Sequence, residues 1–275
     1  MSRFNPEDLC LVVGLASSVL MRRGRRSAAY AVLGSVPAGA AAPSEGFESA
    51  IINLLQEHGT AGASLECKIG DAIARYFVVV PPNNAHRSAD LRLVAELRFE
   101  TLFGDRAADW LVNAQWSATR PFLAGAVPRS LLASLSSAAR SCRFGSPLLQ
   151  GEFVHAWNRH CRSFVDPQGW VLHAGSEASL LVACAGGRVQ AITRVDLVDP
   201  RSAQTLESAI QRWAIRWNVE APKTLYLLGQ SLWVLGGQQS GGTALKLVDD
   251  PAEKLARPWF SLSSWRRGEQ ARGHG

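Results

Sequence analysis

The stretch that decides the fold is residues 169–197, which read GWVLHAGSEASLLVACAGGRVQAITRVDL. Short apolar runs separated by glycine turns are typical of buried strands that follow one another along the chain. Three strands are expected, at residues 170–174, 178–185 and 188–195. The first turn is Gly175-Ser176-Glu177, and the second is a glycine pair, which suits a tight hairpin. This stretch therefore predicts a three-stranded meander.

A helix and a fourth strand follow the meander. Apolar residues recur at helical spacing over residues 205–217, which predicts a helix with one buried face. That face carries Leu206, Ile210, Trp213 and Trp217. Residues 224–228 then predict a strand that ends at Gly229. The turn at 166–169 makes a boundary before this unit, whose order is strand, strand, strand, helix, strand.

The first half of the chain begins in the same way. Residues 9–33 predict a glycine-turned hairpin and a third strand, and the helix that follows is expected to end at His58-Gly59. Residues 14–20, GLASSVL, can be set beneath residues 175–181, GSEASLL, so that the glycine, a serine and the start of the next strand coincide. This match predicts an internal duplication, with chance similarity between two glycine-turned hairpins as the alternative.

Further elements lie between the two repeats. Strands are expected at residues 65–69, 72–80, 110–116 and 122–127. The first two flank a turn at 70–71. An amphipathic helix over 90–103 is expected to stop at Gly104, and Pro128 opens another helix. The helix over 90–103 and the strands at 110–116 and 122–127 fall within about residues 85–130, which are expected to form a small inserted subdomain.

Two lobes of this kind resemble the actin-like ATPase superfamily, and the order of elements is most similar to the PilM family of type IV pilus assembly proteins. The segments that carry this resemblance are LVVGLASSVLMRRGRRSAAYAVLG (11–34), FESAIINLLQEHG (47–59), SLECKIGDAIARYFVVVPP (64–82), residues 169–197 and TLYLLGQ (224–230). Residues 94–112 and 124–138 also resemble the cytoplasmic actin-like domain of the GspL family of type II secretion proteins. Together these segments cover most of the chain.

The resemblance implies an α/β protein with a two-lobed actin-like fold, built from ribonuclease H-like βββαβ repeats. Lobe I would cover residues 9–165 and contain the inserted subdomain. A reduced lobe II would cover residues 166–262, followed by a flexible basic tail at 263–275.

The resemblance also implies a function. These families are cytoplasmic adaptors at the inner membrane, so we expect a non-catalytic scaffold in a type IV pilus or type II secretion-like machine. Its partner would be the cytoplasmic segment of an inner-membrane assembly protein, or the assembly ATPase. No stretch approaches the roughly 18 apolar residues that a membrane span needs, so contact with the membrane is expected only through that partner.

Metal-assisted hydrolysis is not expected from the two hairpins. In actin-like ATPases an Asp two residues before the first glycine helps to organise the metal, but here Val12 precedes Gly14 by two. His173 stands two residues before Gly175, where a second carboxylate is expected. An apolar side chain cannot bind Mg²⁺, and a neutral imidazole is a poor ligand for a hard cation. The chain is therefore not expected to be an enzyme, and no cofactor or metal is expected.

A vestigial nucleotide site is the alternative. Its glycines, hydroxyls and one carboxylate would be those of Gly14, Ser17, Ser18, Gly175, Ser176, Glu177 and Gly229. Such groups could bind ATP, with or without Mg²⁺, although serines in turns more often cap the backbone. In the family, a pair of glycines lies against the adenosine. This chain has Gly229 followed by Gln230 and so departs from that pattern.

The remaining features favour no other class of protein. The net charge is +6, and four arginines cluster at Arg22, Arg23, Arg25 and Arg26, which predicts a solvated turn or a contact with anionic lipid or nucleic acid. Nucleic-acid binding is not expected, because no recognition helix or stacking platform accompanies the cluster. Five cysteines occur singly, which is typical of a reducing compartment. His155, His160 and Cys161 lack the spacing of metal ligands on one helical face, so structural roles are expected.

Overall fold

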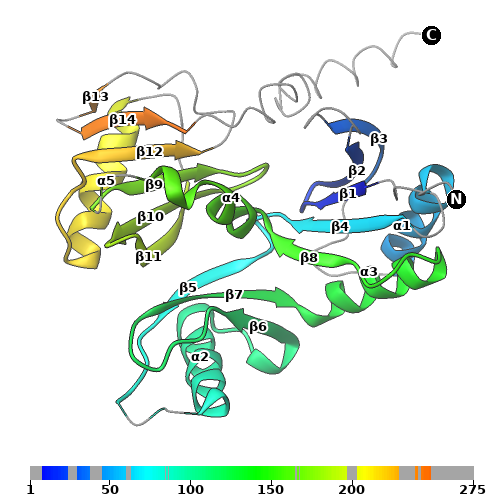
Figure 1. Cartoon of the computed structure of the whole chain (residues 1–275), viewed down its shortest axis with the longest axis horizontal. Coiled ribbons are helices and arrows are strands. Elements are labelled where there is room, and N and C mark those ends of the chain that lie inside the picture. Colours follow the sequence, from blue (N-terminus) through cyan, green and yellow to red (C-terminus); the bar gives the residue numbers. More distant parts are fainter. Residues whose placement is uncertain are drawn as a thin grey trace, which may run out of the picture.

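The computed structural model describes residues 8–23, 30–37, 45–59, 63–83, 85, 87–164, 166, 168–196, 203–228, 239–240 and 243–248. Three sheets organise these residues (Figure 1), with five, six and three strands. The two larger sheets each carry one of the predicted repeats. The smallest sheet lies beside them with its own helix.

The first sheet has the order β3-β2-β1-β4-β8. Its strands are β1 (Asp8–Val13), β2 (Ser17–Arg23), β3 (Tyr30–Pro37), β4 (Ser64–Ile69) and β8 (Leu148–Gly151). Two helices, α1 (Glu45–His58) and α3 (Arg129–Ser141), pack against each other and share one apolar core with this sheet. Because side chains alternate along a strand, Leu9, Leu11 and Val13 face this helical layer, whereas Cys10 and Val12 face the opposite side.

The second sheet has the order β11-β10-β9-β12-β14-β13. Its strands are β9 (Trp170–Ala174), β10 (Ser179–Ala185), β11 (Arg188–Val195), β12 (Thr224–Leu228), β13 (Gln239–Ser240) and β14 (Thr243–Leu247). Helix α5 (Ala203–Trp217) packs on one face through Leu206 and Ile210. In both large sheets the meander is antiparallel, and the strand after the helix runs parallel to the first strand. The predicted two-lobed α/β duplication is confirmed.

The third sheet has the order β5-β7-β6 and carries the inserted part of the chain. It consists of β5 (Arg75–Val79), β6 (Trp110–Ala114) and β7 (Phe122–Pro128), with helix α2 (Ser88–Phe103) on one face. The predicted helix stop at Gly104 is confirmed, because Gly104 adopts φ 74° and donates its N–H to the Glu100 carbonyl. The proposed domain bounds stay a prediction, and residues 263–275 lie outside the described residues.

Two outcomes differ from a simple interpretation of the sequence. Strands β4 and β5 flank the turn at Gly70-Asp71 but do not pair, because β4 is enclosed by β1 and β8 whereas β5 pairs with β7. Sequence patterns also missed β8 and the helix after it, α4 (Glu152–His160), which packs Phe153 into the core between the lobes. No helix within the described ranges is long and apolar enough to cross a membrane.

Candidate functional site

The turns of the two hairpins face each other. The Gly14 N–H donates to the Ser17 carbonyl at 3.0 Å, and the Gly175 N–H donates to the Ala178 carbonyl at 2.9 Å, so the two turns are built alike. Glu177, in the second turn, reaches the first: its carboxylate accepts the N–H of Leu15 and, at 2.6 Å, the N–H of Ala16. The two glycine turns therefore meet between the lobes.

The second turn is held by a carboxylate from the first lobe. Glu152 is the first residue of α4, directly after β8. Its two carboxylate oxygens lie 3.2 and 3.3 Å from the Ser176 backbone nitrogen, and the Ser176 hydroxyl donates to Oε2 at 3.1 Å. Each glycine turn therefore presents its N–H groups to a carboxylate from the opposite lobe.

Glycine is required where these groups approach. A Cβ atom on Gly14 would lie 2.8 Å from the Ser17 carbonyl oxygen and 2.9 Å from the Glu177 carboxylate. A Cβ atom on Gly175 would lie 2.9 Å from Asp71 Oδ2 and 3.0 Å from Glu152 Oε2. Three of these four distances are below 3.0 Å, which is closer than Cβ atoms approach other heavy atoms, so a side chain at either turn would push the lobes apart.

A third carboxylate, Asp71, lies buried beneath the two turns. Its Oδ1 accepts the Tyr76 hydroxyl at 2.8 Å and the Phe153 N–H at 3.0 Å. Its Oδ2 lies 2.9 Å from Nδ1 of His173, on β9. The imidazole of His173 also packs on the Phe153 ring, with 5.7 Å between the ring centroids. Asp71 thus connects the turn after β4, the start of α4 and the second lobe.

Solved structures reveal what this arrangement is similar to. The chain aligns with the PilM-PilN type IV pilus biogenesis complex at a TM-score of 0.60, with 16% identity over 90% of this chain and 89% of that one. It aligns with an actin-like ATPase fold protein of unknown function from Bacteroides thetaiotaomicron at 0.58, with 8% identity over 93% and 98% of the two chains. No protein-family model and no curated protein matches the chain.

A further alignment is with the cytoplasmic domain of EpsL, an inner membrane component of the type II secretion system of Vibrio cholerae. The TM-score is 0.52, and 14% of residues are identical over 91% of this chain and 93% of that one. The chain has the actin-like ATPase fold. In this fold each lobe presents a glycine-turned hairpin, and the paired turns described above are those hairpins.

The actin-like fold brings together most of the residues that the sequence predicts for a nucleotide site. Gly14, Gly175, Ser176 and Glu177 all meet between the lobes. Ser17 contributes its backbone carbonyl, whereas the Ser18 hydroxyl is buried on β2 without a hydrogen-bond partner among the described residues. Gly229 lies outside the described residues. Val12 packs with Cys10 and Met21 in an apolar cluster, which leaves no metal ligand there.

Sequence patterns missed Asp71 and Glu152, although a signal was present. Each follows a glycine at the end of a strand, in Gly70-Asp71 after β4 and Gly151-Glu152 after β8. Because β4 and β8 are parallel neighbours, both carboxylates emerge at the same edge of the sheet. Among the described residues, no cluster of His, Cys, Asp and Glu has the geometry to hold a metal ion.

Electrostatics at this edge favour a bound proton. Burial, followed by the nearby charge of Asp71, raises the pKa of Glu152 from 4.5 to about 7, although His173 and the hydrogen bonds from Ser176 act in the opposite direction. Burial, followed by the charge of Asp71, also raises the pKa of Tyr76 well above its ordinary value. The Tyr76 hydroxyl therefore stays a donor to Asp71.

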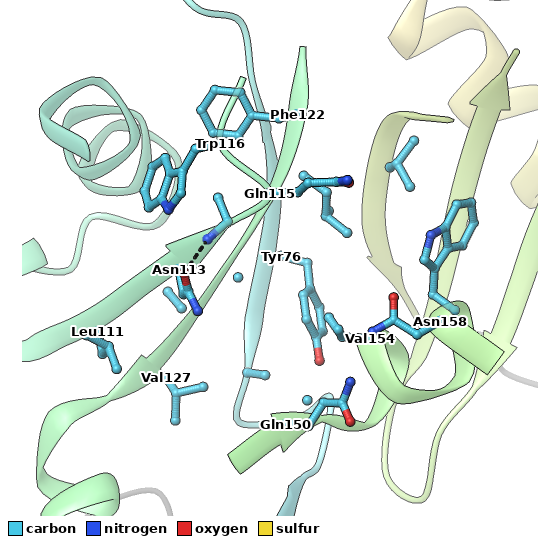
Figure 2. A pocket seen from close by; sticks show the side chains of 18 of the residues that line it. Tyr76, Leu111, Asn113, Gln115, Trp116, Phe122, Val127, Gln150, Val154 and Asn158 are labelled. Atoms are coloured by element: carbon cyan, nitrogen blue, oxygen red, sulfur yellow. Dashed lines mark hydrogen bonds between the residues drawn. The ribbon is translucent and has the colours of Figure 1, made fainter. Parts of the chain in front are cut away.

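A separate groove of about 790 Å³ opens beside this site. Its walls come from the inserted sheet, from β8 and α4, and from the β10–β11 turn of the second lobe. Figure 2 shows Leu111, Asn113 and Val127 on the side of the inserted sheet and Gln150, Val154 and Asn158 across from them. The lining combines apolar side chains with amides and with the two arginines Arg120 and Arg188.

Proposed function

We propose that this chain is a non-catalytic actin-like scaffold that binds an extended segment of a protein partner in this groove. The observation that carries the proposal is the contrast between two sites. The N–H groups between the lobes are already bound by Glu177 and Glu152, whereas the groove is lined by side chains with room for a peptide.

The floor of the groove suits an extended chain. Strand β6 directs Trp110 and Val112 toward α2, and its alternate residues Leu111 and Asn113 line the groove. The sheet face opposite α2 therefore forms the floor. A peptide strand has the same two-residue alternation, so apolar side chains at every second position would contact this face. The side-chain amides of Gln150 and Asn158 can form hydrogen bonds with the backbone of a peptide that lies in the groove.

The charge of the groove selects among such segments. Among the described residues that line it, the charged side chains are Arg120 and Arg188, one from the inserted part and one from the second lobe. A segment with an acidic residue between apolar ones would complement these arginines.

The partner is proposed from the similar structures. One of them is a complex, PilM with PilN, and another is the cytoplasmic domain of an inner-membrane component. We therefore propose that the partner is the cytoplasmic segment of an inner-membrane assembly protein, in a type IV pilus or type II secretion-like machine, with the assembly ATPase as the other candidate. The chain would then be cytoplasmic and peripheral to the inner membrane through its partner.

A binding experiment tests the proposal. The probe is a synthetic peptide of the cytoplasmic segment of a single-span membrane protein encoded beside this gene, titrated by fluorescence anisotropy. We expect micromolar affinity, because a disordered segment must be ordered on binding. Leu111→Asp should weaken binding about tenfold or more, since it places a charge on the apolar floor.

Leu93→Asp is the matched control for this experiment. Leu111 and Leu93 are 43% and 57% exposed, so both substitutions should be tolerated by the fold. Leu93 lies on α2, on the opposite side of the same sheet, and its substitution should leave peptide affinity unchanged. If Leu93→Asp abolishes binding and Leu111→Asp does not, the partner binds the outer face of α2 and the groove proposal fails.

Nucleotide binding is the second candidate function, and the same two turns support it, because backbone N–H groups of this kind bind phosphate oxygens. We propose that ATP is not hydrolysed, since Val12 and His173 supply no carboxylate for Mg²⁺. A ligand at 100 times its dissociation constant stabilises a protein by about 2.7 kcal/mol, so thermal melting with Mg-ATP separates the two functions. An ATPase would show a higher Tm with Mg-ATP and would release phosphate, and Ser17→Ala or Glu177→Ala would abolish that release.

A further inference from the structure

We infer that Glu177 and Glu152 take the place of a bound anion and clamp the two lobes together without any ligand. The exchange is reciprocal: Glu177 extends from the second lobe to the turn at Leu15 and Ala16, and Glu152 extends from the first lobe to Ser176. The residues joined by Glu177 lie 162 and 161 positions apart in the sequence, so each bond links the lobes directly.

The geometry of the first turn is that of an occupied anion site. The two oxygens of Glu177 each accept one of two successive backbone N–H groups. Successive N–H groups in a turn form a concave donor pair that binds phosphate or carboxylate oxygens. Here the protein supplies the carboxylate itself.

An incoming phosphate would meet strong opposition. It would have to displace Glu177 while approaching Glu152 and Asp71, whose carboxylates lie close together beneath the turns. The Asp71 carboxylate repels a phosphate at such distances, and Glu152 adds to this repulsion once it is ionised, as the pH rises through about 7. Displacement of Glu177 would also break its bonds to the N–H groups of Leu15 and Ala16. The clamp therefore excludes polyphosphates and at the same time supplies the contacts that a nucleotide would otherwise make between the lobes.

The clamp also sets the width of the groove, and this step rests on the proposed function. Glu152 begins α4, whose Val154 and Asn158 line one wall, while Gly187 and Arg188 of the second lobe line another. The same carboxylate that holds Ser176 thus fixes both walls relative to each other. Release of the clamp would let the second lobe move and would weaken peptide binding.

Hydrogen–deuterium exchange tests the clamp without any partner. In the wild-type protein, peptides covering residues 14–17 and 175–178 should be protected. Glu177→Ala should accelerate exchange at 14–17 at least tenfold, because the acceptor for two N–H groups is lost. Glu177→Gln, which keeps the shape and one good acceptor oxygen, should give an intermediate rate.

Glu100→Ala is the matched control. Glu100 also accepts a backbone N–H, from Ala107 at 2.8 Å, but within the inserted part of the chain. Its substitution should accelerate exchange only near residue 107. Exchange in β9 and β12 serves as the internal measure that each variant is folded. If Glu177→Ala leaves exchange at 14–17 unchanged in a folded protein, the clamp does not exist in solution.

ATP and pyrophosphate provide the other arm of the test. Neither should slow exchange at residues 14–17 in the wild-type protein, because those N–H groups already have acceptors. Added protection by either anion would overturn the inference. Peptide affinity is measured separately. If the turns exchange rapidly in the wild-type protein, the clamp is refuted, whether or not the peptide binds. If the turns are protected but the protein binds no peptide, only the proposed function is refuted.

Discussion

Nδ1 of His173 lies 2.9 Å from Oδ2 of Asp71, and both side chains are buried. This contact joins β9 of the second lobe to the turn after β4 of the first. Asp71 bonds Tyr76 and the first turn of α4 as well, so one carboxylate connects three elements. The junction between the lobes is therefore polar at its centre and surrounded by apolar packing.

Asp71→Ala should strongly destabilise the protein. It leaves the Tyr76 hydroxyl and the Phe153 N–H without their buried acceptor, and it removes the carboxylate that lies 2.9 Å from Nδ1 of His173. Each buried donor left without a partner costs about 1 to 3 kcal/mol. Tyr76→Phe removes a single hydrogen bond and should cost about 1 kcal/mol. Thermal unfolding followed by circular dichroism gives both values, and equal losses would show that Asp71 is not the centre of the junction.

Stability should depend on pH through Glu152, which faces Asp71 and His173. Its pKa is raised from 4.5 to about 7 in the folded protein, so the folded state holds a proton that the unfolded state releases between these values. The contribution of Glu152 to stability is therefore greatest below about pH 4.5 and is lost as the pH rises through 7.

Glu152→Gln removes this titration while keeping the shape of the side chain. Its Tm should equal that of the wild-type protein near pH 5 and exceed it by a few degrees near pH 8, since about 1 kcal/mol corresponds to a few degrees for a chain of this size. Glu100→Gln, at an exposed carboxylate, is the control. The difference in Tm between this variant and the wild-type protein should not increase between pH 5 and pH 8. A constant difference for Glu152→Gln across this range would contradict the prediction.

Gly14→Ala should separate the hairpin turns. The new methyl group would lie 2.8 Å from a backbone oxygen and 2.9 Å from the Glu177 carboxylate, so Tm should fall by several degrees and exchange at 14–17 should increase. Gly145→Ala is the control, because a Cβ atom there has no neighbour within 4 Å. That substitution should be neutral or stabilising by up to about 1 kcal/mol. Similar Tm values for the two variants would argue against close contact at Gly14.

Membrane recruitment should depend on the partner and not on the arginine cluster. The Arg22 guanidinium already donates to the His58 carbonyl at 3.1 Å, at the end of α1, so it has a structural role. Arg25 and Arg26 lie outside the described residues. In fractionated cells, changing Arg22, Arg23, Arg25 and Arg26 to serine should leave the protein with the membrane as long as the partner is present. Membrane association that survives loss of the partner but not of the arginines would indicate direct lipid binding.

Local pattern in the sequence determined most of the fold. The two meanders, α1, α2, α3 and α5 all follow from apolar spacing and from glycine or proline at element ends, because these signals act within a few residues. β8 and α4 escaped this approach. A strand of four residues is too short to show a period, and α4 buries only Phe153 and His160 fully, so its apolar face is narrow.

Tertiary structure alone decided what the site contains. Glu177 was predicted for the site, but as a group that would face a ligand, and only the packed lobes show that it binds Leu15 and Ala16 instead. Asp71 and Glu152 lie in the same site as Glu177 because β4 and β8 end side by side. In the sequence, 80 residues lie between Asp71 and Glu152. Hydrogen bonds of this kind depend on distance in space, which a one-dimensional pattern does not encode, and they require the two lobes to be packed together around Phe153 and its neighbours.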